Sequence, residues 1–141
     1  MITMLPIRVF KTLKYRDFKI LRAIEIGMNT FEFVPIDYIS RKVKFNIEVT
    51  SMILNKLCKL GVVRRRFGAY EGYSLTTWGY DCLALKYLVD SGYIEAIGKP
   101  LGVGKEADVY DALTPANERV AIKFHRLGRL SFKKTRRVRS Y

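Results

Sequence analysis

Two segments in the first third of the chain repeat apolar residues at the spacing of one helix face. Over residues 15–28 the apolar positions recur every three or four residues, and charged residues fill the other side. This pattern predicts an amphipathic helix. A shorter helix is expected from Pro35, a residue that is tolerated at the first helical position, to about Lys42. Its apolar face comprises Ile36, Ile39 and Val43.

A third helix is predicted to begin near Asn46 and to end at Gly61. The side chain of Asn46 can accept hydrogen bonds from the free N–H groups of the first turn, and glycine suits the position after a helix end. The expected apolar stripe comprises Val49, Met52, Ile53, Leu57 and Leu60.

After Gly61 the pattern changes from helical to extended. Residues 62–67 and 73–75 read as two strands, and the glycine-containing segment 68–72 reads as the turn between them. Three helices followed by a two-stranded wing, with the third helix in the recognition position, indicate a winged helix-turn-helix.

A fourth helix is expected over about 76–90, capped by Thr76 or Thr77 and apolar on nearly every side. Such a helix should be buried on both sides and should fix the winged helix to the unit after it. No flexible linker separates the two units. The sequence therefore predicts an α+β fold, with a winged-helix domain over 1–91 and the first β-strands of a protein-kinase-like N-lobe over 92–141.

The second unit opens with a glycine-rich segment. Gly102, Gly104 and Val109 fit the pattern Gly-x-Gly-x-x-Gly-x-Val, with Ala107 in place of the third glycine, and the run Val-Ala-Ile-Lys ends at Lys123. A glycine-rich hairpin lets backbone N–H groups approach a nucleotide, and a lysine on the next strand can contact its phosphates. We therefore expect ATP to bind to this unit. The candidate nucleotide-binding residues are Gly102, Val103, Gly104, Lys105, Glu106, Ala107, Val109 and Lys123.

The motifs of a kinase catalytic half do not occur in these 141 residues. There is no His-Arg-Asp catalytic loop and no Asp-Phe-Gly metal-binding motif. The sequence therefore offers no candidate catalytic residue or metal ligand, and the ligands of the Mg²⁺ that accompanies ATP are expected beyond residue 141. His125, the single histidine, has no evident orienting partner, which favours a structural role over that of a general base.

The chain is strongly basic, with 26 Lys and Arg against 13 Asp and Glu and a formal charge of +13. Eight of the basic residues lie within 121–141, where no acidic residue occurs. Such a block is either a solvated tail or a segment that faces an anionic partner such as a nucleotide or RNA. Cys58 and Cys82 are expected to be buried free thiols, typical of a reducing interior. Without a signal peptide or a long apolar run, a soluble cytoplasmic protein is expected.

Basic residues of the wing and of the third helix could meet nucleic acid. Lys and Arg neutralise phosphates, although a solvated strand face explains the wing arginines equally well. Glu48 lies at the end of the third helix that would approach bases, which disfavours sequence-specific DNA reading. The aromatic residues Phe31, Phe33, Tyr70 and Tyr73 are expected to pack in the core and hinge rather than to stack on bases. The candidate nucleic-acid-binding residues are Arg64, Arg65, Arg66, Lys56 and Lys59.

Four segments in this order, 91–98, 102–106, 120–125 and 131–134, carry a resemblance to a known family. They resemble the RIO family of atypical protein kinases, in the branch whose kinase domain follows a winged helix, over nearly the whole chain. Ala107 departs from that branch, which typically has a serine there, so only backbone contacts are expected at this position.

The resemblance implies an ATP-dependent serine/threonine kinase or ATPase that acts in maturation of the small ribosomal subunit. Lys123 would bind phosphate, and the basic run 126–139 would begin a flexible loop near the nucleotide. The implied partners are ATP and the small ribosomal subunit precursor with its rRNA, without a membrane. Two alternatives remain open: a winged-helix DNA-binding transcription regulator, and a non-catalytic adaptor that uses the winged helix for protein contacts.

Overall fold

The computed structural model describes residues 6–103, 107–125 and 138–140. The chain divides into two compact units, Met1–Leu83 and Ala84–Tyr141. The division falls within helix α5 (Thr77–Asp90), which contributes residues to both units. The domain limits 1–91 and 92–141 remain a prediction.

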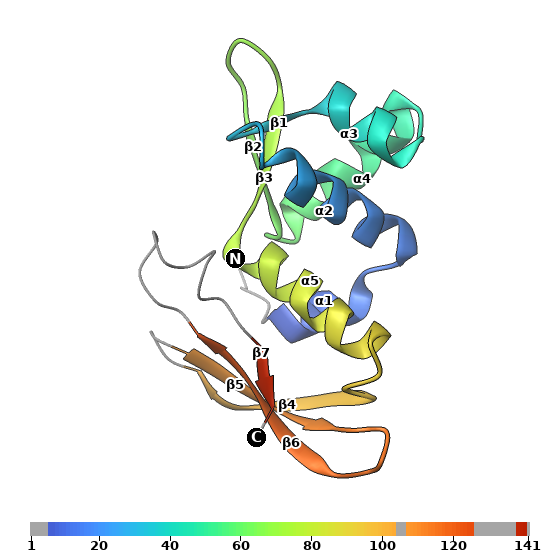
Figure 1. Ribbon diagram of the computed structural model, residues 1–141. Coiled ribbons are helices and arrows are strands. Elements are labelled where there is room, and N and C mark those ends of the chain that lie inside the picture. The colour runs from blue at the N-terminus through green and yellow to red at the C-terminus, as the bar shows by residue number, and fades with distance from the viewer. Residues whose placement is uncertain (1–5, 104–106, 126–137, 141) are drawn as a thin grey trace. The chain divides into compact units, whose positions relative to one another are not determined.

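The first unit combines helices with a small antiparallel sheet. Its helices are α1 (Pro6–Thr12), α2 (Tyr15–Gly27), α3 (Ile36–Val43) and α4 (Ile47–Lys59). Its strands are β1 (Val34–Pro35), β2 (Val63–Arg66) and β3 (Gly72–Leu75), in the order β1-β3-β2. Figure 1 shows the loop between β2 and β3 extending away from α2, α3 and α4. This arrangement is a winged helix, and the predicted fold class is confirmed.

The core of the first unit forms where α2, α3 and α4 face one another and the sheet. Its fully buried members include Ile20, Ile24, Ile39, Leu54 and Leu57. Removal of this apolar surface from water is the main stabilising contribution. Asn46 caps α4 as predicted, since its side chain accepts a hydrogen bond from the backbone N–H of Val49 at 2.8 Å. Gly61 follows the helix with a φ of 81°, also as predicted.

The apolar stripe predicted for α4 is wrong at Met52, which is 56% exposed. The buried face instead runs through Thr50, Ile53, Leu54 and Leu57. Thr50 can be buried because its hydroxyl donates a hydrogen bond to the carbonyl of Asn46 at 2.8 Å. The buried face of α4 therefore includes a polar residue, and for this reason it differs from the face that the apolar residues alone predict.

Three further elements differ from expectation. Pro35 does not begin α3 but precedes it in extended conformation, pairing with Gly72 at the edge of the sheet. Proline is tolerated on an edge strand because it has no N–H to donate. Helix α1 was not predicted, although Ile7 and Val9 on it are buried. In α5, Tyr87 is exposed, so the expectation of a helix buried on both sides is wrong at that residue.

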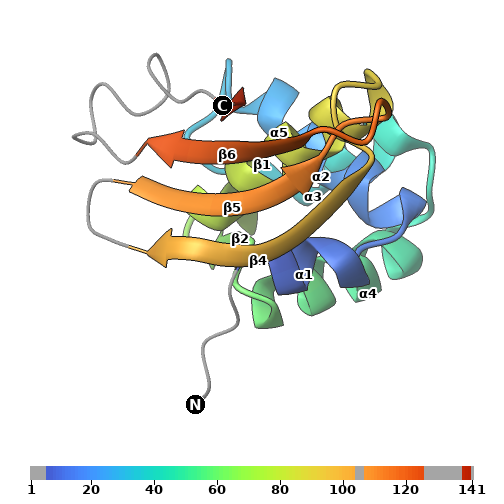
Figure 2. The same ribbon diagram turned by 90° about the horizontal axis from the view of Figure 1, so that it is seen from below.

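The second unit contains a four-stranded antiparallel sheet. Its strands, β4 (Ala96–Val103), β5 (Ala107–Leu113), β6 (Arg119–His125) and β7 (Val138–Ser140), pair in chain order. Figure 2 shows β4, β5 and β6 side by side. One face of this sheet is largely buried, and its buried residues include Tyr110, Ala112, Ile122 and Phe124. Because strand side chains alternate between faces, the intervening residues point the other way.

Candidate functional site

Three candidate nucleotide-binding residues lie in one row across the second sheet. Gly102 on β4 is the Cα partner of Val109 on β5, and Val109 is in turn the partner of Lys123 on β6. Directly paired residues of neighbouring strands project from the same face. The antiparallel pairing therefore brings together a glycine and a lysine that lie far apart in the sequence.

The row lies on the face opposite to the buried one. Lys123 is half-buried, and Ala121, two residues before it on β6, shares its face. Ala121 is not among the candidate residues nominated from the sequence, although the alternation along Val-Ala-Ile-Lys is a sufficient signal. This face thus presents Lys123 beside the small apolar side chains of Val109 and Ala121, and Arg119 on the same face pairs with Asp111 at 3.1 Å.

Among the residues that the structure describes, none gives position 102 a reason to be a glycine. Its φ lies outside the left-handed region, and a Cβ added there would meet no heavy atom within 4 Å. Neither backbone conformation nor packing against the described part of the chain therefore selects glycine at this position. Close approach of a bound group to the backbone would select it.

The other members of the glycine-rich segment are only partly described. Val103 and Ala107 pair through the backbone with Asp108 and His125, respectively. Gly104, Lys105 and Glu106 lie outside the described residues, as does most of the basic run 126–139.

The arginine run on the wing is divided between two faces of the hairpin. Arg64 and Arg66 lie over the ring of Phe33, with guanidinium carbons 5.9 and 4.1 Å from its centroid. Both residues are exposed, and Arg66 also lies 3.5 Å from the carboxylate of Glu32. Alternation along β2 turns Arg65 the other way. Arg64 and Arg66 are therefore the members of the run that solvent reaches most readily.

Arg65 belongs to a hydrogen-bond network that ties the wing to α4. Its guanidinium donates to the side-chain oxygen of Asn55 and, from Nε at 3.1 Å, to the hydroxyl of Tyr73. Tyr73 donates in turn to Glu71, whose carboxylate lies 3.8 Å from Arg65. Burial, reinforced by the hydrogen bond to Glu71, raises the pKa of Tyr73 to about 12. The network fixes the hairpin against the helix, and no pattern in the sequence signals the role of Asn55.

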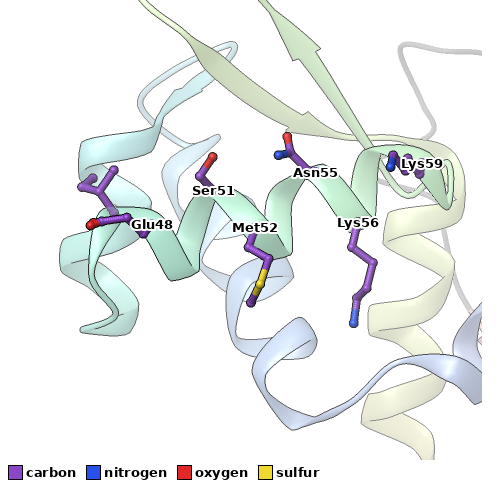
Figure 3. Close-up of a pocket in the computed structure, with 7 residues that line it drawn as sticks. Glu48, Ser51, Met52, Asn55, Lys56 and Lys59 are labelled. Carbon is purple, nitrogen blue, oxygen red and sulfur yellow. The ribbon is translucent and has the colours of Figure 1, made fainter.

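The outer side of α4 forms an open groove of about 690 Å³. Figure 3 shows Ser51 and Asn55 projecting from one side of this surface, and Met52 and Lys56 from the other. Asn55 already accepts a hydrogen bond from Arg65. Lys56 forms an ion pair with the buried Asp17, at 2.6 Å. The full lining of the groove comprises Ile47, Glu48, Ser51, Met52, Asn55, Lys56 and Lys59.

Two kinds of site are absent from the part of the chain that the structure describes. Residues 6–103, 107–125 and 138–140 contain no group of three His, Cys, Asp or Glu side chains that could hold a metal ion. Among the same residues, no helix combines the length and apolar character needed to cross a membrane. Both cysteines are thiols, as predicted; Cys82 is buried, whereas Cys58 is only half-buried.

Comparison with known proteins finds relatives whose similarity extends over both units. Residues 10–91 match the family model described as Rio2, N-terminal. The chain belongs to the Rio2 family. The relatives that match this chain are described as serine/threonine-protein kinases, and the match covers only part of each of them.

Two Rio2 relatives illustrate the match. The serine/threonine-protein kinase rio2 of Dictyostelium discoideum is 39% identical over 134 residues, which cover 93% of this chain and 26% of that protein. The RIO-type serine/threonine-protein kinase Rio2 of Methanocaldococcus jannaschii is 40% identical over 114 residues, or 81% of this chain and 41% of that protein. The chain thus spans less than half the length of each of these relatives.

Solved structures agree with the sequence match. The Rio2 kinase of Chaetomium thermophilum, in a complex with ADP/Mg²⁺ and phosphoaspartate, gives a TM-score of 0.79 at 32% identity, covering 92% of this chain and 39% of that one. MepR, a transcription regulator of Staphylococcus aureus, gives a TM-score of 0.51 at 14% identity and covers 61% of this chain. The latter likeness concerns the winged-helix fold alone.

Proposed function

We propose that this chain is the ATP-binding N-terminal part of a RIO-type kinase or ATPase that acts in maturation of the small ribosomal subunit. In this proposal its winged helix binds RNA of the pre-ribosomal particle. The observation that carries the nucleotide assignment is the row of Gly102, Val109 and Lys123 on one face of the second sheet. ADP/Mg²⁺ in a Rio2 structure of 32% identity supports the choice of ligand.

The residues on this face fit a nucleotide. The ammonium of Lys123 provides a point charge for phosphate oxygens, and the open position beside Gly102 leaves the backbone accessible to them. Val109 and Ala121 offer a small apolar surface of the kind that a base requires. ATP would supply the phosphoryl group. The described residues supply no set of ligands for Mg²⁺, so no step of the reaction is assigned to the metal.

Nucleotide binding is tested by replacing one lysine of the sheet at a time. Lys123→Ala should weaken ATP binding by about 2 kcal/mol, because a charged hydrogen-bonding partner is lost from a half-buried site. Lys99→Ala, which removes an exposed lysine from β4, is the matched control. Calorimetric titration of the full-length kinase with ATP makes the comparison. Equal losses in the two variants would show that Lys123 has no special role.

The winged helix is better suited to RNA backbone than to reading of DNA bases. Two side chains of α4 that could contact base edges are engaged, since Asn55 bonds to Arg65 and Lys56 pairs with Asp17. Arg64 and Arg66 remain exposed on the outer face of the wing. Phosphate contacts of this kind position a protein without specifying sequence.

Backbone binding predicts a particular salt dependence. Replacing Arg64 and Arg66 with glutamine should weaken binding of the chain to every RNA sequence. A plot of log affinity against log salt concentration should also become less steep, by about one in slope for each phosphate that is no longer neutralised. The double replacement of Arg41 and Lys42, two exposed basic residues at the end of α3, is the control with the same change in charge. Fluorescence anisotropy at several salt concentrations provides the data.

The outcome also separates the proposal from its main alternative. Strong preference for one DNA duplex that survives replacement of both wing arginines would favour a transcription regulator. Co-sedimentation of the full-length protein with small-subunit precursors tests the ribosomal part. If the protein binds free RNA but does not co-sediment with the precursors, the ribosomal part of the proposal is contradicted and the RNA-binding part is not.

A further inference from the structure

The tip of the wing carries an exposed aromatic residue directly after the arginine run. Phe67 follows β2 and is 71% exposed. The tip extends away from the helices of its unit (Figure 1). At Gly68, the next residue, an added Cβ would find open space. A large apolar ring is thus presented to solvent where little of the chain surrounds it.

Arginines lie on both faces of the strand that leads to this ring. The guanidinium of Arg65 lies 5.7 Å from the ring centroid of Phe67. On the other face of β2, Arg64 and Arg66 are held over Phe33, which limits their freedom before any ligand binds. An aromatic side chain flanked by arginines combines the two contacts that single-stranded nucleic acid requires, namely stacking with a base and neutralisation of phosphate.

We propose that the wing tip binds unpaired RNA nucleotides, with Phe67 stacked on a base and with Arg64 and Arg66 on the adjacent phosphates. This inference rests on the proposed RNA binding of the winged helix and specifies its site. The bases of a duplex are already stacked on one another, so Phe67 gains a partner only where a base is unpaired. The wing tip therefore discriminates between single-stranded and double-stranded RNA.

Residues around the wing tip affect the position of Phe67 and the availability of the arginines for phosphate. Arg65 anchors the hairpin to α4 through Asn55 and to β3 through Tyr73, so the position of Phe67 is defined before RNA binds. Glu32, by contrast, lies 3.5 Å from Arg66 and competes with phosphate for that guanidinium. Glu32→Gln should therefore strengthen RNA binding, an effect opposite to that expected when an arginine is removed.

The test uses the 141-residue chain with a fluorescein-labelled single-stranded RNA and with a duplex of the same sequence. Phe67→Ala should weaken binding to the single strand by roughly tenfold, within the range for base–aromatic stacking, and should leave duplex binding nearly unchanged. Phe67→Tyr should retain affinity and Phe67→Leu should not, because only the former keeps an aromatic face. Tyr15→Ala is the matched control, since Tyr15 is also 71% exposed and also lies beside a basic residue, Lys19. Near-ultraviolet circular dichroism verifies that each variant is folded.

Three results would overturn the inference. Unchanged single-strand affinity in Phe67→Ala would do so, and so would full binding by Phe67→Leu, which would show that only apolar contact matters. An equal loss in Tyr15→Ala would place the stacking contact elsewhere. In all three cases the wild-type chain still binds RNA, so the proposed function survives. If the wild-type chain binds neither the single strand nor the duplex, both the wing-tip inference and the proposed RNA binding are contradicted.

Discussion

The ammonium of Lys56 on α4 lies 2.6 Å from the carboxylate of Asp17 on α2, whose side chain is only 3% exposed. The same carboxylate accepts a hydrogen bond from the backbone N–H of Lys14 at 2.8 Å, so that it also caps α2. A buried carboxylate needs such partners because the loss of hydration is unfavourable. The pair therefore joins two helices of the winged helix and removes Lys56 from the set of free basic residues.

Lys56→Ala should lower the free energy of unfolding by about 1–3 kcal/mol, because it leaves the charge of Asp17 without its cation. The value lies below that for a fully buried pair, since the side chain of Lys56 is 46% exposed. Lys59→Ala, on the same helix, should change stability by less than about 0.5 kcal/mol. Urea denaturation measures both. Equal effects would show that the ion pair contributes nothing specific.

Gly79→Ala should destabilise the protein, although alanine favours helices. A Cβ at Gly79 in α5 would lie 2.3 Å from the carbonyl oxygen of Val62, a backbone atom that cannot move aside easily. The expected loss is at least about 2 kcal/mol, typical of overpacking. Gly68→Ala is the control, since a Cβ there meets nothing within 4 Å. Thermal unfolding of the two variants makes the comparison, and a stable Gly79→Ala variant would contradict the close approach of α5 to Val62.

Cys82 should resist thiol reagents at pH 8 while the protein is folded. Burial raises its pKa from 9.0 to about 12, and Asp81 adds to the effect. Because the folded pKa is raised, the stabilising contribution is complete below pH 9 and is lost as pH rises toward 12. Colorimetric thiol titration of the Cys58→Ser variant measures the reactivity of Cys82 alone. Rapid reaction without denaturant would contradict its burial.

The elements with strong local signals are predictable from the sequence. The predicted helices at 15–28 and 46–60 and the hairpin after Gly61 agree with the structure to within a few residues. Met52 is exposed against expectation, because the apolar pattern does not reveal that Thr50 can be buried through a hydrogen bond to its own helix. Helix α1 has only 7 residues, too few to display a helical period.

The contacts of the wing are not predictable in the same way. Alternation implies that Arg65 faces away from Arg64 and Arg66, but not which face of the hairpin meets α4. That depends on tertiary packing, which brings Asn55 to Arg65 across ten positions of the sequence. In the sheet of the second unit, the row of Gly102, Val109 and Lys123 depends on the strand register, including the irregular pairing of β4. The motif is visible in the sequence, whereas its geometry is not.

Gly102→Ala should separate stability from nucleotide binding. The added methyl group meets none of the described residues within 4 Å, so the free energy of unfolding should stay within about 0.5 kcal/mol of the wild type. Under the proposed function, ATP affinity should fall by roughly tenfold, because the methyl group occupies space that the phosphates need. Gly98→Ala on the same strand is the control, since its Cβ would make only ordinary contacts, the nearest at 3.6 Å. Competition with a fluorescent ATP analogue measures affinity. Unchanged binding in Gly102→Ala would contradict the role of this glycine.

The most direct test of nucleotide binding by this chain is a methyl NMR titration of residues 1–141 with ATP and Mg²⁺. Val109 and Ala121 lie on the proposed nucleotide face, whereas Ala112 and Ile122 lie on the buried face of the same sheet. We predict saturable shifts of the Val109 and Ala121 methyl signals, little change at Ala112 and Ile122, and a marked reduction of the effect in Lys123→Ala. Shifts confined to the buried face, or no saturable shift on either face, would contradict the account.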